Sequence, residues 1–328
     1  MSRWSSLPIL IVAALLLSTQ RSPAPLVYTP GEGWIYEPVG SEGKWRRARA
    51  KDQLEVAEKA FELKDYSLAL RAARAVVKQW PLSDYAPRAQ YIVGRCYEAK
   101  KQDERAFKEY SSALKNYPRS DTFDELLQRQ FVIAGRFLGG QWFKLWGIFP
   151  IPPSMEKTSE LYKKIVEVGP YSEVGPQAQM KIGEARMKQK DYPLAAKAYE
   201  VAVDRYSDRP VVAADAFYKA GIAYDKQSLK AEYDQTTAGR AIETFNDFMT
   251  LYPEDSRVPD ARKKISNLKV EQARGNFDIA EYYEKRKKFQ GALIYYNEVL
   301  TLDPGSTYAD KARERIEALK QRITHGGS

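Results

Sequence analysis

A recurring pattern of small and aromatic residues limits what this chain can fold into. Within residues 90–118 its members are Gly94, Tyr97, Ala106, Tyr110, Ala113 and Pro118. Residues three or four apart share one face of an α-helix, and proline interrupts a helix. The spacing therefore predicts two antiparallel helices that approach closely at the small residues, with the aromatic rings filling the space between them.

The pattern returns several times further along the chain. One copy has Ala280, Tyr283, Ala292, Tyr296 and Pro304, another has Gly221, Tyr224, Ala241, Phe245, Phe248 and Pro253, and a third has Gly183, Ala195, Tyr199 and Ala202. Weaker copies end at Pro81 and Pro170, and Tyr206 with Ser207 stands where the copy at 183–202 lacks its proline. The 37-residue step from Pro81 to Pro118 is close to the ~34 residues of the tetratricopeptide repeat, whose signature the pattern resembles.

These repeats predict an all-α fold, a tetratricopeptide-like α-solenoid of about six helix pairs. Residues 308–322 predict a closing helix, because a stack of repeats must cover its last apolar surface. The expected divisions are N-terminal repeats 1–3 in residues 46–170, C-terminal repeats 4–6 with the closing helix in residues 171–322, and a disordered tail in residues 323–328.

The N-terminal residues 1–24 have the composition of an export signal. Arg3 precedes the apolar run Ile9–Leu17, which is too short for a bilayer that needs roughly 20 residues but is typical of a signal peptide. Cleavage is expected after Ala24. A bacterial lipoprotein signal would carry a cysteine just after the apolar run, and none is present there. Lipid anchoring through this segment is therefore unsupported.

Residues 25–45 predict an extended arm rather than a helix, because prolines and glycines interrupt the segment. The arm also contains aromatic and apolar residues that a plain tether does not need, namely Tyr28, Trp34, Ile35, Tyr36 and Trp45. We expect these side chains to dock on the first repeat, and release onto a partner is the alternative.

The least repeat-like segment is an insertion at residues 131–153. Gly139 and Gly140 interrupt any helix, and aromatic residues follow at Trp142, Phe143, Trp146 and Phe149. Such density indicates either a plug between neighbouring repeats, which we favour, or an exposed contact with a partner or with the membrane interface.

Residues that carry chemistry are scarce. His325 is the only histidine and Cys96 the only cysteine, so histidine acid–base catalysis and histidine or thiolate metal sites are not expected. No glycine-rich phosphate loop is present. We expect a non-enzymatic protein with no cofactor and no metal, in which Cys96 is a buried structural thiol. The sequence does not set the oligomeric state.

The charge pattern is equally unspecific. The net charge of +9 comes from 52 basic and 43 acidic residues that are intermixed along the chain. An excess of positive charge favours acidic partners or an anionic membrane surface, but intermixed charges on repeat helices are typical of solvated faces. No nucleic-acid partner is expected.

A binding groove is expected where the first helices of successive repeats lie together. In the second repeat Arg88, Tyr91, Arg95 and Glu98 are spaced by three, four and three residues. Two guanidinium groups around a tyrosine can hold a carboxylate and stack on an aromatic ring, as an extended peptide with an aromatic C-terminus requires. The alternative is that the two arginines pair with acidic residues of adjacent repeats.

The C-terminal residues permit a more specific comparison. Residues 280–304 resemble the last repeat of the BamD family, lipoproteins of the machinery that assembles β-barrel proteins in the outer membrane. The aromatic-proline-serine pattern at Trp80–Ser83, Tyr117–Ser120 and Tyr252–Ser256 is also similar. The resemblance covers about residues 46–322.

This resemblance implies a periplasm-facing scaffold without catalytic residues. Its N-terminal repeats, including the Arg88 group, would receive unfolded barrel precursors. Its C-terminal repeats would bind the barrel-bearing partner subunit, through Arg274, Phe277, Glu281 and Glu284. The absent lipoprotein cysteine and the Trp-rich insertion depart from the family. One alternative is a general periplasmic repeat protein that binds peptides or coordinates envelope and cell-division proteins. Another is a regulatory subunit of an envelope enzyme, or an enzyme with unrecognised carboxylate chemistry.

Overall fold

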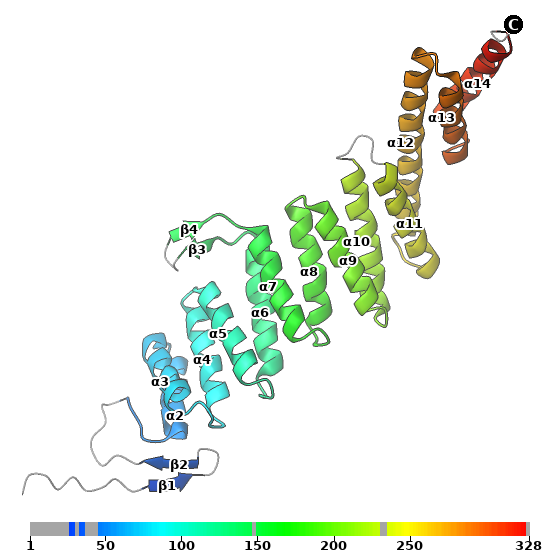
Figure 1. The fold of residues 1–328 in the computed structure, drawn as a ribbon. Helices are drawn as coiled ribbons and strands as arrows, with labels where there is room; N and C mark the ends of the chain where they lie inside the picture. The colour runs from blue at the N-terminus through cyan, green and yellow to red at the C-terminus, as the bar shows by residue number, and fades with distance from the viewer. Residues whose placement is uncertain (1–25, 30–32, 37–44, 146–148, 230–234, 326–328) are drawn as a thin grey trace, which may run out of the picture. The chain divides into compact units, whose positions relative to one another are not determined.

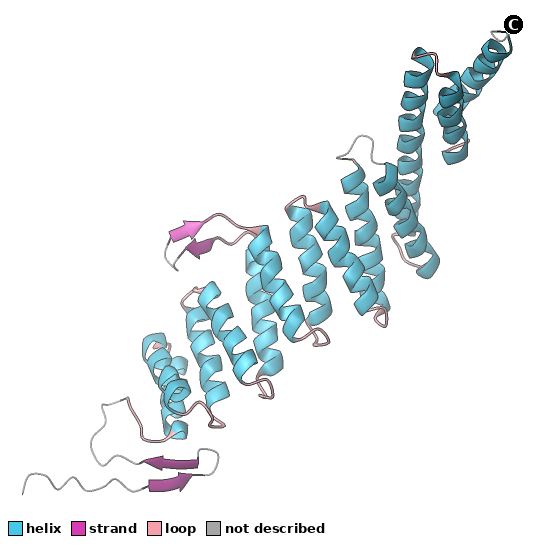
Figure 2. Cartoon of the chain, viewed as in Figure 1, coloured by secondary structure: helices cyan, strands magenta, loops and turns pink. Residues whose placement is uncertain are grey.

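The computed structural model describes residues 26–29, 33–36, 45–145, 149–229 and 235–325. In this part of the chain the fold is all-α and tetratricopeptide-like, with two small two-stranded sheets (Figures 1 and 2). None of the described helices combines the length and apolar composition needed to cross a membrane. The expected export signal at residues 1–24 lies outside the described residues.

The described helices form six consecutive pairs and a closing helix, as the repeats predict. The pairs are α2 (Ala50–Glu62) with α3 (Tyr66–Gln79), α4 (Ala86–Ala99) with α5 (Asp103–Asn116), α6 (Phe123–Leu138) with α7 (Met155–Val168), α8 (Gly175–Lys188) with α9 (Tyr192–Arg205), α10 (Pro210–Ser228) with α11 (Gln235–Leu251), and α12 (Val258–Lys285) with α13 (Phe289–Leu302); α14 (Thr307–His325) closes the series.

The chain divides into two compact units. The first comprises the residues up to Gln130 together with Lys144–Phe149, and the second comprises Phe131–Phe143 and Pro150–Ser328. The division between them falls within α6, whereas the division expected at residue 170 lies inside the second unit.

The turn within a helix pair is built in the same way in four of the pairs. Lys64, Lys101, Lys190 and Lys287 have φ angles of 61°, 55°, 60° and 59°, the left-handed conformation that ends many helices. The next residue donates its N–H to a carbonyl five positions back, as from Asp65 to Ala60 at 2.9 Å. The carboxylate of Asp65 then accepts from Leu68 N at 3.0 Å and caps α3. Local sequence therefore sets each reversal.

The junction between pairs also repeats. Tyr117 follows α5, and its hydroxyl donates to the carbonyl of Pro81, which follows α3, at 3.1 Å. In the second unit Tyr206 makes the equivalent bond to Pro170 at 2.8 Å. Both bonds join residues 36 positions apart, so Tyr206 occupies the repeat end that the sequence assigns to it.

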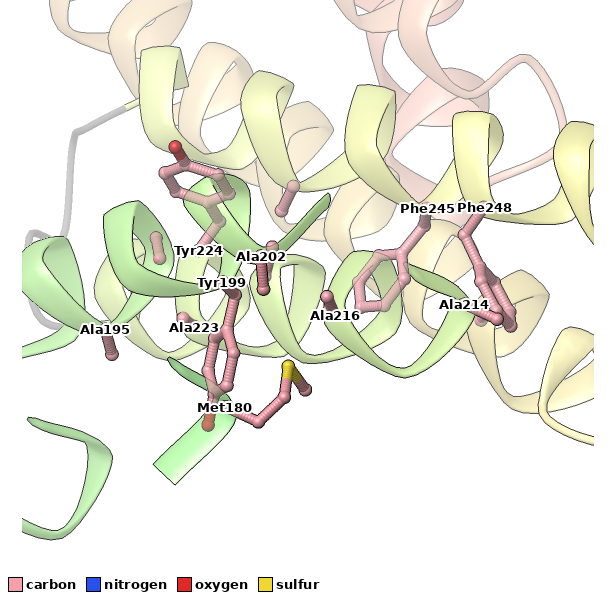
Figure 3. Close-up of a cluster of buried hydrophobic side chains, with 14 of the residues drawn as sticks. Met180, Ala195, Tyr199, Ala202, Ala214, Ala216, Ala223, Tyr224, Phe245 and Phe248 are labelled. Carbon is pink, nitrogen blue, oxygen red and sulfur yellow. The ribbon is translucent and has the colours of Figure 1, made fainter. Parts of the chain in front are cut away.

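The core between the pairs consists of alanines and aromatic rings. In the second unit Tyr199, Phe245 and Phe248 are buried against alanines of α9, α10 and α11 (Figure 3). The ring of Tyr224 joins the same cluster, and its hydroxyl faces away from it (Figure 3). Small residues and rings therefore alternate as the sequence pattern predicts.

The arm expected in residues 25–45 contains two paired β-strands rather than a simple extended segment. β1 (Leu26–Thr29) and β2 (Gly33–Tyr36) pair in antiparallel register, with Val27 opposite Ile35 and Tyr28 opposite Trp34. The β-branched and aromatic residues of both segments favour such pairing. One expected contact with the first repeat is present, because the guanidinium of Arg71 in α3 lies 5.5 Å from the centre of the Trp45 ring.

Two further boundaries differ from expectation. α6 continues to Leu138, so the insertion begins at Gly139 rather than at residue 131, and Gly140 has a φ of 100°. The insertion then contributes β3 (Phe143–Leu145) and β4 (Phe149–Ile151), which form the second sheet. α14 continues to His325, so residues 323–325 are helical rather than disordered.

Candidate protein-binding surfaces

The residues expected to line a client groove in α4 are bound to one another and to neighbouring helices. Tyr91 is only 3% exposed; its hydroxyl donates to Glu125 of α6 and accepts from Arg95 Nη1 at 2.6 Å. Burial raises the pKa of Tyr91. The expectation that Tyr91 points outward is therefore wrong. Its hydrogen-bonding groups serve the packing of α4 against α6.

The two arginines beside Tyr91 have partners within the first unit. Arg88 Nε lies 3.0 Å from Glu58 Oε1 of α2, and Arg95 Nη1 lies 4.0 Å from Glu125 Oε1. Both guanidinium groups also stand over the Tyr91 ring, at 5.3 and 5.6 Å from its centre. This is the alternative arrangement, in which the arginines pair with acidic residues of adjacent repeats.

Glu98, the fourth residue expected in the groove, also has its partners within the first unit. Its carboxylate accepts from the Tyr110 hydroxyl at 2.9 Å and lies 3.9 Å from Arg129 Nη1. Of the four residues, only Arg88 keeps about half of its side chain exposed. Any external carboxylate bound at this face would therefore first meet Arg88.

The insertion contains both buried and exposed aromatic residues. Phe143 is buried and stacks on Phe137 of α6, with ring centres 4.1 Å apart. Trp142 and Phe149 are 54% and 57% exposed, and Trp146 lies outside the described residues. Neither expectation holds for the whole insertion: Phe143 packs internally, whereas Trp142 and Phe149 each present an aromatic side chain to solvent.

Two of the four residues expected on the partner face have their main contacts within the second unit instead. Phe277 is 8% exposed and packs against Tyr296 and Tyr308, with ring centres 5.2 and 5.8 Å apart. Glu284 accepts from the Tyr296 hydroxyl at 3.0 Å and from both Arg315 Nε and Nη2, at 3.1 and 2.9 Å. These contacts tie the closing helix to α12 and α13, so Phe277 is buried and the Glu284 carboxylate is already bound within the protein.

The other two expected residues are partly exposed and each pairs along α12. Arg274 Nη2 lies 2.6 Å from Glu271 Oε2, and Glu281 Oε2 lies 3.3 Å from Lys285 Nζ. The larger exposed apolar side chains nearby are Tyr282 at 53% and Ile294 at 66%. The sequence of α13 already pointed to a contact at Ile294. This helix is apolar on nearly every face, a composition that favours burial on both sides.

A cleft that the sequence analysis did not find lies between α9, α10 and α11. Its volume is about 360 Å³, and it is lined by Glu200, Val203 and Asp204 of α9, by Phe217, Ala220 and Tyr224 of α10, and by Arg240, Glu243, Thr244 and Asp247 of α11. A sequence signal existed: residues 210–256 contain eight acidic and four basic residues in a chain whose net charge is +9.

The described residues provide no metal site. They contain no group of three or more histidine, cysteine, aspartate or glutamate side chains placed to hold an ion. Cys96 is buried, and burial raises its thiol pKa to about 11.

Comparisons with known proteins agree with the repeat geometry. Residues 154–303 match the outer membrane lipoprotein family (YfiO), and residues 54–121 match a tetratricopeptide repeat family. No curated protein sequence matches the chain.

Several solved structures are similar to the chain. The C-terminal part of a TPR repeat-containing protein from Cytophaga hutchinsonii is 16% identical over 80% of this chain and 87% of that chain, with a TM-score of 0.35. YrrB, a TPR protein with an unusual peptide-binding site, is 16% identical over 66% and 92% of the two chains, with a TM-score of 0.33. MamA is 15% identical over 63% and 94%, with a TM-score of 0.34.

The helix pairs and the match of residues 54–121 to a tetratricopeptide repeat family agree on a tetratricopeptide-like fold. The two matched families are generally non-catalytic scaffolds for protein interactions. This chain has an all-α, tetratricopeptide-like fold, its residues 54–121 match a tetratricopeptide repeat family, and its residues 154–303 are similar to the outer membrane lipoproteins.

Proposed function

We propose that this protein is a non-catalytic, periplasm-facing scaffold of the machinery that assembles β-barrel proteins in the outer membrane. It binds unfolded barrel precursors and a partner subunit of that machinery. The observation that carries the proposal is the match of residues 154–303 to the outer membrane lipoproteins. The BamD-like residues 280–304 and the export-type N-terminus support it.

Purification from native membranes tests this proposal directly. A tagged full-length chain is expressed in its own host, extracted in mild detergent, and the retained proteins are identified by mass spectrometry. Recovery of a barrel-assembly subunit and of barrel precursors is the expected result. Recovery of a peptidoglycan synthase without any barrel-assembly subunit would instead favour the envelope-coordinating alternative.

The partner-binding surface is proposed on α12 and α13. Tyr282 and Ile294 are the exposed apolar side chains there, and Arg274 and Glu281 of α12 are also partly exposed. Exposed apolar side chains are typical anchors of protein interfaces. In the purification experiment, Tyr282→Ser with Ile294→Ser should reduce recovery of the assembly subunit, whereas Val211→Ser with Leu82→Ser, also at exposed apolar positions, should not.

The client-binding surface is proposed around Arg88, whose guanidinium is half exposed. Arg88→Glu should weaken binding of peptides that end in an aromatic residue with a free carboxylate. The swapped variant Glu58→Arg with Arg88→Glu restores an ion pair of opposite polarity between α2 and α4. Continued weak binding by the swapped variant supports a direct role for Arg88, and recovery of binding would reduce the role of Arg88 to packing.

Peripheral membrane contact through the insertion completes the proposal. Trp142 and Phe149 are exposed, and Lys144 follows Trp142 in the same segment, a composition suited to a bilayer interface. The mature protein should float with liposomes, and Trp142→Ser with Trp146→Ser should abolish flotation. Unchanged flotation of that variant would remove the insertion from the membrane-contact proposal.

A further inference from the structure

The cleft between α9, α10 and α11 has an apolar floor and an acidic rim. Val203, Phe217 and Ala220 form the floor, and Phe217 is only half-buried although its ring packs beside Tyr252. Each helix contributes residues three or four positions apart, so that each presents one face to the cleft. The lining is therefore a continuous surface made by two consecutive repeats.

Three carboxylates of the rim have no cationic partner among the described residues. They are Asp204 of α9 and Glu243 and Asp247 of α11, all exposed at the cleft. Glu243 and Asp247 are four residues apart on one helix, a spacing at which like charges repel. A cation bound in the cleft would relieve that repulsion.

Other carboxylates of the same repeat are neutralised within the protein. Asp215 lies 2.7 Å from Arg257 Nη1, and Asp225 lies 3.0 Å from Lys264 Nζ. The repeat therefore pairs acidic residues where they serve packing between α10 and α12. It leaves Glu243 and Asp247 of α11 without a cationic partner in the described part of the chain.

One end of the cleft shows how a basic side chain is held there. The guanidinium of Arg240 lies 4.4 Å from the centre of the Tyr224 ring, and its Nη2 lies 3.3 Å from Glu200 Oε1. The Tyr224 hydroxyl donates to the same carboxylate. A cation over an aromatic face and beside a carboxylate is a favourable arrangement. The chain's own arginine provides it at this end, and the three unpaired carboxylates continue the acidic surface beyond it.

We propose that this cleft docks a short peptide segment of a partner protein, with at least two lysine or arginine side chains next to apolar ones. The basic groups pair with Asp204, Glu243 and Asp247, while the methylene stems and the apolar side chains cover Phe217 and Val203. Charge complementarity selects the partner, because residues 210–256 carry a net negative charge within a basic protein. The inference rests on the proposed role as a protein-binding scaffold but not on barrel assembly.

A direct binding assay on the purified mature protein tests the inference. The probes are three fluorescein-labelled peptides, GKLRLKG, GKSRSKG and GELELEG, and binding is followed by fluorescence anisotropy at 50 mM and 300 mM NaCl. The basic apolar peptide should bind at least about tenfold more tightly than the serine version. The acidic peptide should not bind, and higher salt should weaken the basic peptide because exposed charges are screened.

The decisive variant neutralises the rim: Asp204→Asn, Glu243→Gln and Asp247→Asn together. Its matched control changes the charge equally at exposed carboxylates elsewhere in the second unit, with Glu156→Gln, Glu167→Gln and Glu298→Gln. The rim variant should lose at least about tenfold in affinity for GKLRLKG and the control should stay within about twofold. Circular dichroism confirms that both variants keep their helicity.

Three results would overturn the inference. Equal losses in the rim variant and its control would mean unspecific attraction to the protein as a whole. Unchanged affinity in the rim variant would place binding elsewhere. Self-association in sedimentation velocity that disappears in the rim variant, without peptide binding by the wild type, would make a second copy of this chain the occupant. Because the assay contains no assembly subunit, its outcome is independent of the purification experiment.

Discussion

The ring of Tyr110 in α5 occupies the space in which a side chain at Gly94 in α4 would lie. A Cβ atom added to Gly94 would stand 2.1 Å from Cε1 of Tyr110, far inside van der Waals contact. The same relationship joins Gly183 to Tyr199 and Gly221 to Phe245, at 2.4 and 2.6 Å. In each of these repeats the ring on the partner helix therefore leaves room only for a glycine.

This relationship predicts that Gly94→Ala destabilises the protein although alanine is the better helix former. The added methyl must displace the fully buried Tyr110 ring, whose hydroxyl is held by Glu98. Overpacking of this kind costs about 1–3 kcal/mol. The apparent free energy of unfolding in urea measures the effect.

Gly239→Ala in α11 is the matched control for that substitution. A Cβ atom at Gly239 would meet nothing within 4 Å, so only the gain in helix propensity of about 0.5–1 kcal/mol remains. The control variant should be as stable as the wild type or more stable. If the two variants had equal effects, the close approach of Tyr110 would not explain Gly94.

Substitutions of the two aromatic residues Phe143 and Trp142 in the insertion should differ in their effect on stability. Phe143→Ala should cost about 3 kcal/mol, because its buried ring stacks on Phe137 and supports α6. Trp142→Ser should change stability by about 0.5 kcal/mol or less, because Trp142 is more than half exposed. Thermal unfolding of both variants measures the difference. A large loss for Trp142→Ser would indicate that its exposed ring has a packing role.

The sequence predicted the helix pairs well because their signals are local. Small and aromatic residues three or four apart define a packed face, and Pro81 or Tyr206 marks the end of a repeat without knowledge of any distant contact. The four residues of α4 that were expected to line a groove show the limit of that reasoning. Whether Tyr91 faces solvent depends on Glu125, which lies 34 positions later in the next helix pair.

The surfaces escaped prediction for the same reason. The resemblance to the BamD family implies a partner-facing Phe277, but the closing helix brings Tyr308 onto its ring, a contact that the sequence of α12 alone does not reveal. The hairpin of β1 and β2 depends on pairing between two short segments. The acidic cleft combines three helices of two repeats, and single helices show only scattered carboxylates.

The burial of Cys96 leads to a chemical prediction. Its thiol is buried in α4, and burial raises its pKa to about 11. The reactive thiolate is therefore a minor species at pH 8, and the native protein should react with a thiol reagent such as DTNB at least about a hundredfold more slowly than the protein in 6 M guanidinium chloride. The unfolded chain should release one equivalent of product, because Cys96 is the only cysteine. A native rate close to the unfolded rate would mean that α4 opens readily.

The junction between α11 and α12 should make stability depend on pH. Asp255 accepts two hydrogen bonds from the Arg257 guanidinium, at 2.9 and 2.8 Å, and one from the Arg257 backbone N–H at 2.9 Å. These bonds to Arg257 lower the pKa of Asp255 from 3.8 to about 2. Because the folded pKa lies below the unfolded one, the stabilisation is complete above about pH 5 and is lost as the pH falls toward 2.

Asp255→Asn should therefore reduce the apparent free energy of unfolding by about 1–2 kcal/mol at pH 7. The difference from the wild type should shrink between pH 4 and pH 2, because over this range Asp255 takes up a proton more readily in the unfolded wild-type chain than in the folded one. Urea titrations at intervals from pH 7 to pH 2.5 measure this convergence. Asp310→Asn is the control, because its ion pair with Arg313 is mostly exposed and should contribute less than about 0.5 kcal/mol. A difference for Asp255→Asn that stayed constant down to pH 2.5 would show that the lost interaction does not depend on the charge of the carboxylate.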